Sequence, residues 1–106
     1  MELLEPDDTL HKDAYAQKIE RRMWALTAEL EKLAARAEAQ LAKAGPATRA
    51  LYDELSSTLQ AQHEWLRRRL GELRSIGEGW RELANTIESG WREVNKTLHQ
   101  TSVRLA

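Results

Sequence analysis

Residues 79–100 consist of one eleven-residue unit written twice. Gly79-Trp-Arg-Glu-Leu-Ala-Asn-Thr-Ile-Glu-Ser89 is followed by Gly90-Trp-Arg-Glu-Val-Asn-Lys-Thr-Leu-His-Gln100. Eleven residues complete three helical turns at about 3.67 residues per turn, so an apolar stripe with this period scarcely drifts around the helix axis. The repeat therefore predicts an α-helix with one apolar edge. This edge comprises Trp80, Leu83, Ile87, Trp91, Val94 and Leu98.

The composition of the whole chain is typical of long helices. The 106 residues are 42% hydrophobic and 31% charged, and they include no phenylalanine and no cysteine. β-Branched residues are scarce and no stretch alternates apolar with polar residues, so we predict an all-α protein with a single domain. Sixteen basic and seventeen acidic side chains give a net charge of −1. This balance does not favour a nucleic-acid partner, and the lack of cysteine excludes disulfides and thiolate chemistry.

Gly45-Pro46 divides the chain into two helical segments. We expect a flexible lead-in over residues 1–8 and a first helix over about 9–44, because apolar residues recur there every three or four positions. Gly45 would close this helix in a left-handed conformation, and Pro46 would open the next helix. A connection this short makes the helices antiparallel. The prediction is thus a long antiparallel helical hairpin or coiled coil over residues 9–106. Its seam would pair Leu26, Leu30 and Leu33 with Leu59, Leu66 and Leu73.

The second helical segment covers about residues 47–104, and its continuity is open at Gly77-Glu78-Gly79. Each glycine costs roughly 1 kcal/mol in a helix interior, and Ser75 with Glu78 has the spacing of a capping box. The apolar stripe nevertheless crosses the glycines without a change of phase. We therefore favour one continuous, bent helix and keep a third helix beginning at Gly77–Gly79 as the alternative.

A continuous second helix would extend beyond the reach of the first one. Counted back from the turn, the first helix is used up near residue 82, so the later apolar side chains would lack cover within the chain. A soluble protein rarely leaves such an edge exposed, and a small hairpin buries little surface. We therefore expect a homo-oligomer of two or more chains, in particular a dimer that forms a four-helix bundle or an antiparallel coiled coil. A fold-back at Gly77–Gly79 is the alternative that needs no partner. The expected oligomer interface is Trp24, Trp80, Leu83, Ile87, Trp91, Val94 and Leu98.

The opposite face of the first helix combines one tryptophan with small side chains. These residues are Trp24, Ala28, Ala35, Ala39 and Ala42. Alanines allow helices to approach closely, but alanine is also simply a good helix former at exposed positions. Trp24 is the more informative residue, because its ring would be exposed in a monomer.

No group of residues has the pattern of a chemical site. His11, His63 and His99 are far apart, and none lies in a Glu-x-x-His pair of the kind that holds metal in helical bundles. The basic run Arg67-Arg68-Arg69 points in three directions on a helix, and we expect Arg69 to pair with Glu20 or Glu72. We therefore expect no catalytic, cofactor-binding or metal-binding residues.

A membrane surface is the alternative partner. Amphipathic repeats with tryptophan occur in helices that lie at the lipid interface, although the polar face here carries both charge signs. No apolar run approaches the ~20 residues of a membrane-spanning helix, and the acidic start does not have the pattern of a signal peptide. These features lead us to expect a cytoplasmic protein.

Over most of residues 12–105, the chain resembles a family of small bacterial coiled-coil proteins described as stress-response proteins. The residues that carry the resemblance are Ala14-Tyr15 with Lys18-Ile19, Ala28-Glu29-Leu30 with Lys32-Leu33 and Ala35-Arg36-Ala37, Leu70–Leu73, Trp80-Arg-Glu-Leu and Trp91-Arg-Glu-Val. Gly45-Pro46, Trp24 and Trp65 depart from that family's pattern. The resemblance implies a helical bundle without catalysis. We accordingly expect a non-enzymatic structural or protein-interaction protein, associated with stress if the resemblance holds, with a membrane-surface helix protein as the alternative.

Overall fold

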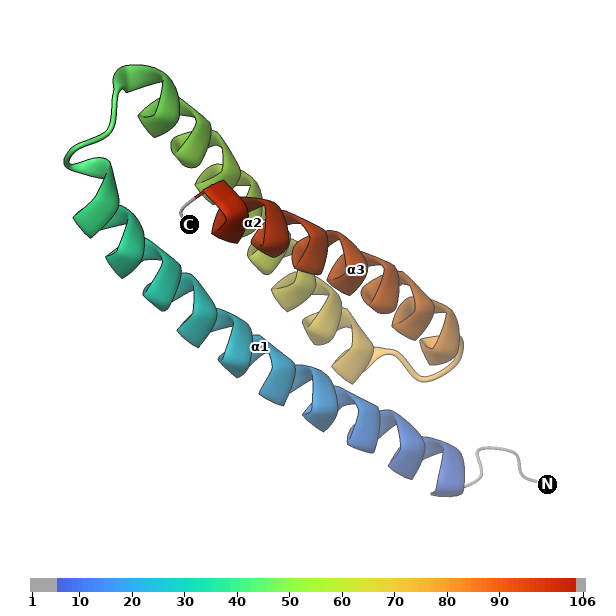
Figure 1. Ribbon diagram of the computed structural model, residues 1–106. Helices are drawn as coiled ribbons and strands as arrows, with labels where there is room; N and C mark the ends of the chain where they lie inside the picture. The colour runs from blue at the N-terminus through green and yellow to red at the C-terminus, as the bar shows by residue number, and fades with distance from the viewer. Residues whose placement is uncertain (1–5, 105–106) are drawn as a thin grey trace.

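Three α-helices form an elongated antiparallel bundle in the computed structural model, which describes residues 6–104. Helix α1 spans Pro6–Leu41, α2 spans Pro46–Ser75 and α3 spans Trp80–Arg104. Helix α2 runs antiparallel to α1, and α3 folds back along α2 (Figure 1). The molecule measures 65 × 18 × 18 Å. The expectation of an all-α protein is confirmed.

The first helix begins earlier than the sequence predicted. Residues 6–8, which we assigned to the flexible lead-in, belong to α1. Proline is well tolerated in the first turn of a helix, because the N–H that it lacks would have no intrahelical partner there. Residues 1–5, the rest of the expected lead-in, lie outside the described residues.

The connection between α1 and α2 covers residues 42–45, so α1 ends three residues before the predicted residue 44, and Gly45 has a different role. Helix α1 ends at Leu41, whose carbonyl accepts hydrogen bonds from Ala44 N at 3.1 Å and Arg49 Nη1 at 3.1 Å. Gly45 has φ −73° and ψ 168°, so it is the extended N-cap of α2 and not a left-handed helix end. The reason is Pro46, because a residue before proline is pushed out of the helical region into the extended one.

The second helical segment is two helices, so the expected continuous helix over 47–104 is wrong. Helix α2 ends at Ser75, and α3 begins at Trp80 after Gly79, which has φ +77°. Only glycine adopts this left-handed conformation without strain. The Ser75 hydroxyl donates back to the Gly71 carbonyl at 2.9 Å within α2, so it does not open α3, and Ile76 caps α2 with its N–H on the Glu72 carbonyl at 2.9 Å. Glu82 N instead bonds to the Gly79 carbonyl at 3.2 Å.

The energetic reason for the reversal is burial of the apolar edge of α3. The two glycines lower the cost of interrupting the helix, since each would already destabilise a helix interior by roughly 1 kcal/mol. Folding back leaves Ile87 at 0% and Val94 at 1% exposure. Burying one such side chain stabilises by about 1.5–3 kcal/mol, so these two alone outweigh the interruption.

The core follows the seam that the sequence predicted and adds α3 to it. Leu26, Leu66 and Leu73 lie in one buried cluster, and Leu33 and Leu59 lie in a second one nearer the α1–α2 turn. Leu30 is half-buried and contacts both clusters. From α3, the first cluster receives Trp80, Ala84, Ile87, Trp91 and Val94.

The Trp65 ring of α2 lies against the backbone of α3 at Gly90. A Cβ atom placed on Gly90 would lie 2.3 Å from Trp65 Cζ3 and 3.0 Å from Cε3. Carbon atoms in ordinary contact are about 3.5–4.0 Å apart, so the ring occupies the space that any side chain at residue 90 would need. The missing side chain thus allows Trp65 to pack directly on the α3 backbone.

Candidate interaction surface

The seven residues predicted to form an oligomer interface separate into two groups. Six lie on α3, and its fold-back places them against the core of their own chain. Trp80, Ile87, Trp91 and Val94 are buried, and Leu83 and Leu98 are half-buried. A second subunit is not needed to cover them, so the uncovered tail on which we based the dimer does not exist. Trp24 is the exception, because 71% of its surface is exposed.

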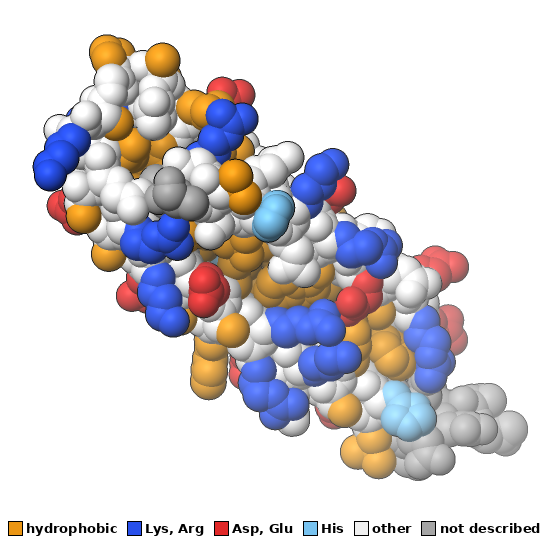
Figure 2. Space-filling view, in the orientation of Figure 1, with side chains coloured by type: hydrophobic (Ala, Val, Ile, Leu, Met, Phe, Trp, Pro, Cys, Tyr) orange, Lys and Arg blue, Asp and Glu red, His pale blue; other side chains and the backbone are white. Residues whose placement is uncertain are grey.

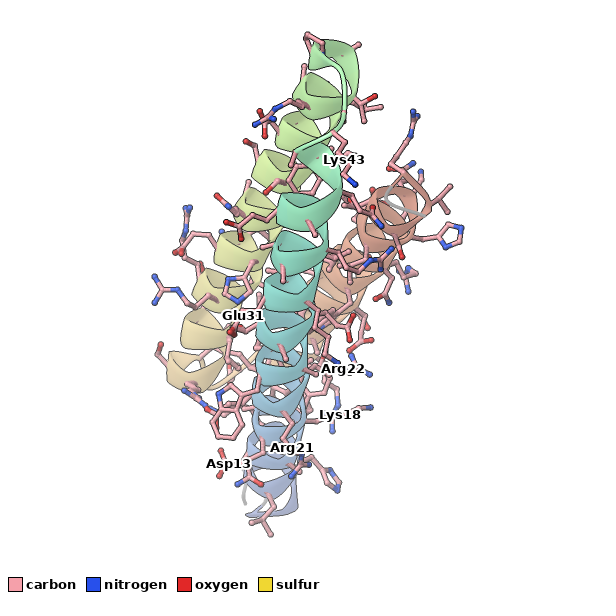
Figure 3. All side chains as sticks on the ribbon, turned by 60° about the vertical axis from the view of Figure 1, so that its left-hand side comes forward. Asp13, Lys18, Arg21, Arg22, Glu31 and Lys43 are labelled. Carbon is pink, nitrogen blue, oxygen red and sulfur yellow. The ribbon has the colours of Figure 1, made fainter. Side chains whose placement is uncertain are left out.

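Trp24 lies on the side of α1 that faces away from α2 and α3. The residues on this side recur at alternating steps of four and three, so they form one stripe along the helix. We call this stripe the outer face of α1, and all its members are exposed: Leu10, Ala14, Gln17, Arg21, Trp24, Ala28, Glu31 and Ala35. Figure 3 views α1 from outside, with the other two helices behind it. The outer face therefore presents one large aromatic ring among small and polar side chains.

Within the described part of the chain, two charged residues of the outer face lack ion pairs of the kind that Glu20, Arg22 and Glu29 form. Arg22 pairs with Glu88 of α3 at 3.0 Å, Glu20 pairs with Arg74 of α2, and Glu29 is 3.8 Å from Lys32. Within residues 6–104, no ion pair or hydrogen bond joins the side chain of Arg21 or that of Glu31 to another group. Both charges (labelled in Figure 3) are thus available to a partner.

The side of α1 that faces α3 carries a polar network that the sequence did not reveal. The Tyr15 hydroxyl donates to Glu88 Oε2 at 2.6 Å, and Arg22 Nη1 donates to the same carboxylate at 3.0 Å. Burial together with the Glu88 carboxylate raises the pKa of Tyr15 well above its ordinary value of 10.0. Burial tends to raise the pKa of Glu88, but the hydrogen bonds from Tyr15 and Arg22 outweigh it and lower the pKa below 4.5. This network holds a carboxylate ionised between two helices.

An open groove continues from this network along α1 and α3, with a volume of about 400 Å³. Its floor contains Leu26, Trp91 and Leu98, and its rims carry Arg22 and Glu88 among other charged residues. Figure 2 shows this face, with hydrophobic side chains visible between rims on which basic and acidic groups alternate. The groove has no single charge sign that would select an anionic or a cationic ligand.

The three arginines of the basic run pair with two carboxylates of α2. Arg67 Nη2 lies 3.0 Å and Arg68 Nε 3.6 Å from the Glu64 carboxylate, and Arg69 Nη1 lies 2.6 Å from Glu72. The prediction that Arg69 pairs with Glu20 or Glu72 is confirmed for Glu72. Its guanidinium also lies over the Trp65 ring, 5.3 Å from the ring centre.

The three histidines remain apart. His11 and His99 are exposed, and the His63 ring is 3.2 Å from the Thr27 hydroxyl. Among the residues that the structure describes, no group of histidines and carboxylates could hold a metal ion. Over the same residues, none of the helices combines the length and the apolar character that crossing a membrane requires.

Comparison with known proteins gave no relationship: no protein-family profile matches the chain, and no curated protein or solved structure is significantly similar to it.

Proposed function

We propose that this chain is a non-enzymatic helical protein that acts by binding protein through the outer face of α1. The observation that carries the proposal is Trp24, an indole ring that is 71% exposed in the middle of a long, otherwise regular helix. Tryptophan is the residue type most enriched at the centres of protein interfaces, where it fills a pocket and loses its contact with water. The role fits the stress-associated coiled-coil proteins that the sequence resembles.

The polar side chains of the bundle support a structural role for the rest of the molecule. Tyr15, Arg22 and Glu88 satisfy one another, and Glu64 and Glu72 form ion pairs with the basic run. A catalytic carboxyl normally has a pKa shifted toward neutrality, whereas the pKa of Glu88 is lowered. We therefore assign this network to joining α1 and α3.

Binding to a membrane surface is the competing function, and it makes a different demand on the structure. The apolar edge of α3 could meet lipid only if α3 left the bundle, because Trp80 and Trp91 are each 8% exposed. Lipid binding would then coincide with loss of the bundle, whereas protein binding through Trp24 would leave it intact. Co-sedimentation with vesicles of phosphatidylcholine and phosphatidylglycerol, combined with tryptophan emission, separates these two functions.

A photo-crosslinker at residue 24 tests the proposal directly. Replacing Trp24 with p-benzoylphenylalanine keeps an aromatic group at the exposed position, and the same crosslinker at Gln60 provides a control on an exposed site of α2. Illumination in cells should give a discrete protein adduct at position 24 and none at position 60. The mass of the adduct then gives the mass of the protein that is bound. A folded protein that forms no adduct at position 24 would refute the proposed function.

A further inference from the structure

The outer face of α1 is complementary to itself about the level of Leu26. Leu26 is buried and points into the core, so the outer face lies on the opposite side of the helix. Trp24 lies two residues before this level and Ala28 two residues after it, while Arg21 and Glu31 lie five residues before and after it. A large side chain is thus balanced by a small one, and a positive charge by a negative one.

A second α1 helix placed antiparallel across this face would satisfy both pairs twice. A twofold axis at the level of Leu26 brings Trp24 against the partner's Ala28 and Arg21 against the partner's Glu31. Rotation about this axis generates each contact twice, once from each chain, as a symmetric dimer interface requires. Two indole rings would be covered, and four charges that have no ion-pair partner among the described residues of their own chain would be paired.

The parallel arrangement lacks this match. Two parallel copies in register would place Arg21 beside the partner's Arg21 and Glu31 beside the partner's Glu31, and like charges at such a contact repel. The charge pattern therefore selects both the direction and the register of the pairing.

The remaining outer-face residues allow the two helices to approach closely. Ala14, Ala28 and Ala35 have small side chains, and Gln17 would oppose the partner's Ala35. Helix axes lie 8–10 Å apart according to the size of the contacting side chains, and alanine favours the lower end of this range. The stripe from Leu10 to Ala35 covers 26 residues, or roughly 39 Å of helix.

We propose that the partner bound by the outer face is a second copy of this chain, antiparallel across α1 with Trp24 on the partner's Ala28 and Arg21 on the partner's Glu31. This inference rests on the proposed function, since it names the protein that the same surface binds. It differs from the dimer expected from the sequence, because the α3 residues of that interface stay within their own bundle.

Charge reversal with sedimentation equilibrium tests the pairing. Arg21→Glu and Glu31→Arg should each weaken self-association about tenfold or more, because two attractive contacts per dimer become repulsive. An equimolar mixture of these two variants should associate as tightly as the wild type, since the mixed dimer restores both contacts. The chain with both substitutions should also associate. Failure of the mixture to recover association, or unchanged association of the single variants, would overturn the proposal.

An engineered disulfide tests the register. The chain has no cysteine, so Gln17→Cys with Ala35→Cys introduces the only two thiols. They lie about 27 Å apart along one helix and cannot join within a chain, because bridged Cα atoms lie within about 7 Å. Mild oxidation should give a covalent dimer, and the matched pair Gln17→Cys with Ala39→Cys should react more slowly. Equal rates for the two pairs would contradict the register.

The role of Trp24 is tested with a matched exposed residue on another helix. Trp24→Ala should weaken self-association about tenfold or more, and Val103→Ala on α3, where the side chain is 57% exposed, should not change it. A wild-type chain that stays monomeric at all attainable concentrations would overturn the self-pairing. If residue 24 still crosslinked to a different protein, the proposed function would stand without it.

Discussion

Replacing Gly90 with alanine should destabilise the bundle although alanine is the better helix former. The new Cβ would lie 2.3 Å from Trp65 Cζ3, well inside the contact distance of about 3.5–4.0 Å. The ring cannot turn away freely, because it packs against the core and lies under the Arg69 guanidinium. Either α2 and α3 separate by more than an ångström at this level, or Trp65 leaves its position.

The magnitude follows from two opposing effects. Alanine gains about 1 kcal/mol over glycine in a helix interior, while overpacking of this kind costs about 1–3 kcal/mol. Gly71 is the matched control, since it lies inside α2 and a Cβ there would have no neighbour within 4 Å. We expect Gly71→Ala to stabilise the bundle by about 1 kcal/mol and Gly90→Ala to destabilise it by up to about 2 kcal/mol.

Thermal unfolding followed by circular dichroism measures both variants. A change of 1 kcal/mol shifts Tm by about 4–8 °C in a domain of this size, so the opposite signs are easily resolved. In a Trp65→Ala background, Gly90→Ala should become stabilising, because the obstructing ring is gone. If Gly90→Ala raised the stability of the wild-type chain as much as Gly71→Ala does, the close approach of α2 and α3 would be wrong.

Three further predictions concern the turn, the polar network and the core. Gly79→Ala should lower the free energy of unfolding by about 1–2 kcal/mol, because Gly79 has φ +77°. Gly77→Ala should change this free energy little, and urea unfolding measures both variants. The pKa of Glu88 is lowered from 4.5 in the folded protein, so its ionised carboxylate stabilises the fold. This stabilisation should be complete above about pH 4.5 and should disappear as the pH falls through the lowered pKa. The difference in unfolding free energy between wild type and Glu88→Gln should therefore shrink with acidification, and a constant difference would argue against the network. Trp91→Ala should cost about 3–5 kcal/mol and Trp24→Ala less than about 0.5 kcal/mol, so equal losses would contradict their assigned burial.

The sequence was sufficient for the all-α class, the approximate position of the α1–α2 connection and the seam, because these depend on local patterns. The leucine spacing has one structural interpretation, whereas Gly45-Pro46 marks the connection although Gly45 caps α2 and does not close α1. The reversal after α2 was kept only as the alternative because the apolar stripe keeps its phase across the glycines. The phase of the apolar stripe indicates which side of a helix is apolar, but it does not indicate whether the chain turns back to bury that side. The conformation of Gly79 decides whether the chain turns back. The free energy that stabilises this turn comes from tertiary packing of α3, which the sequence pattern does not show.

The candidate surface was predicted in part, for a related reason. Trp24 was recognised as a ring that a monomer would expose, and the structure leaves it exposed. The six α3 residues were assigned to an interface on the assumption of an uncovered tail, which the reversal removes. Tyr15 and Glu88 are 73 positions apart, so their hydrogen bond could not be inferred before α3 was placed beside α1.

The eleven-residue period of α3 determines which changes in chain length this bundle could accept during evolution. Losing or gaining a complete unit moves the end of α3 by about 16 Å yet keeps every later apolar residue on the same side. Losing a single residue would instead rotate everything beyond it by about 100° and turn the core positions toward water. Homologues with shorter or longer third helices should therefore differ by whole units, whereas insertions of other sizes should be confined to the two turns.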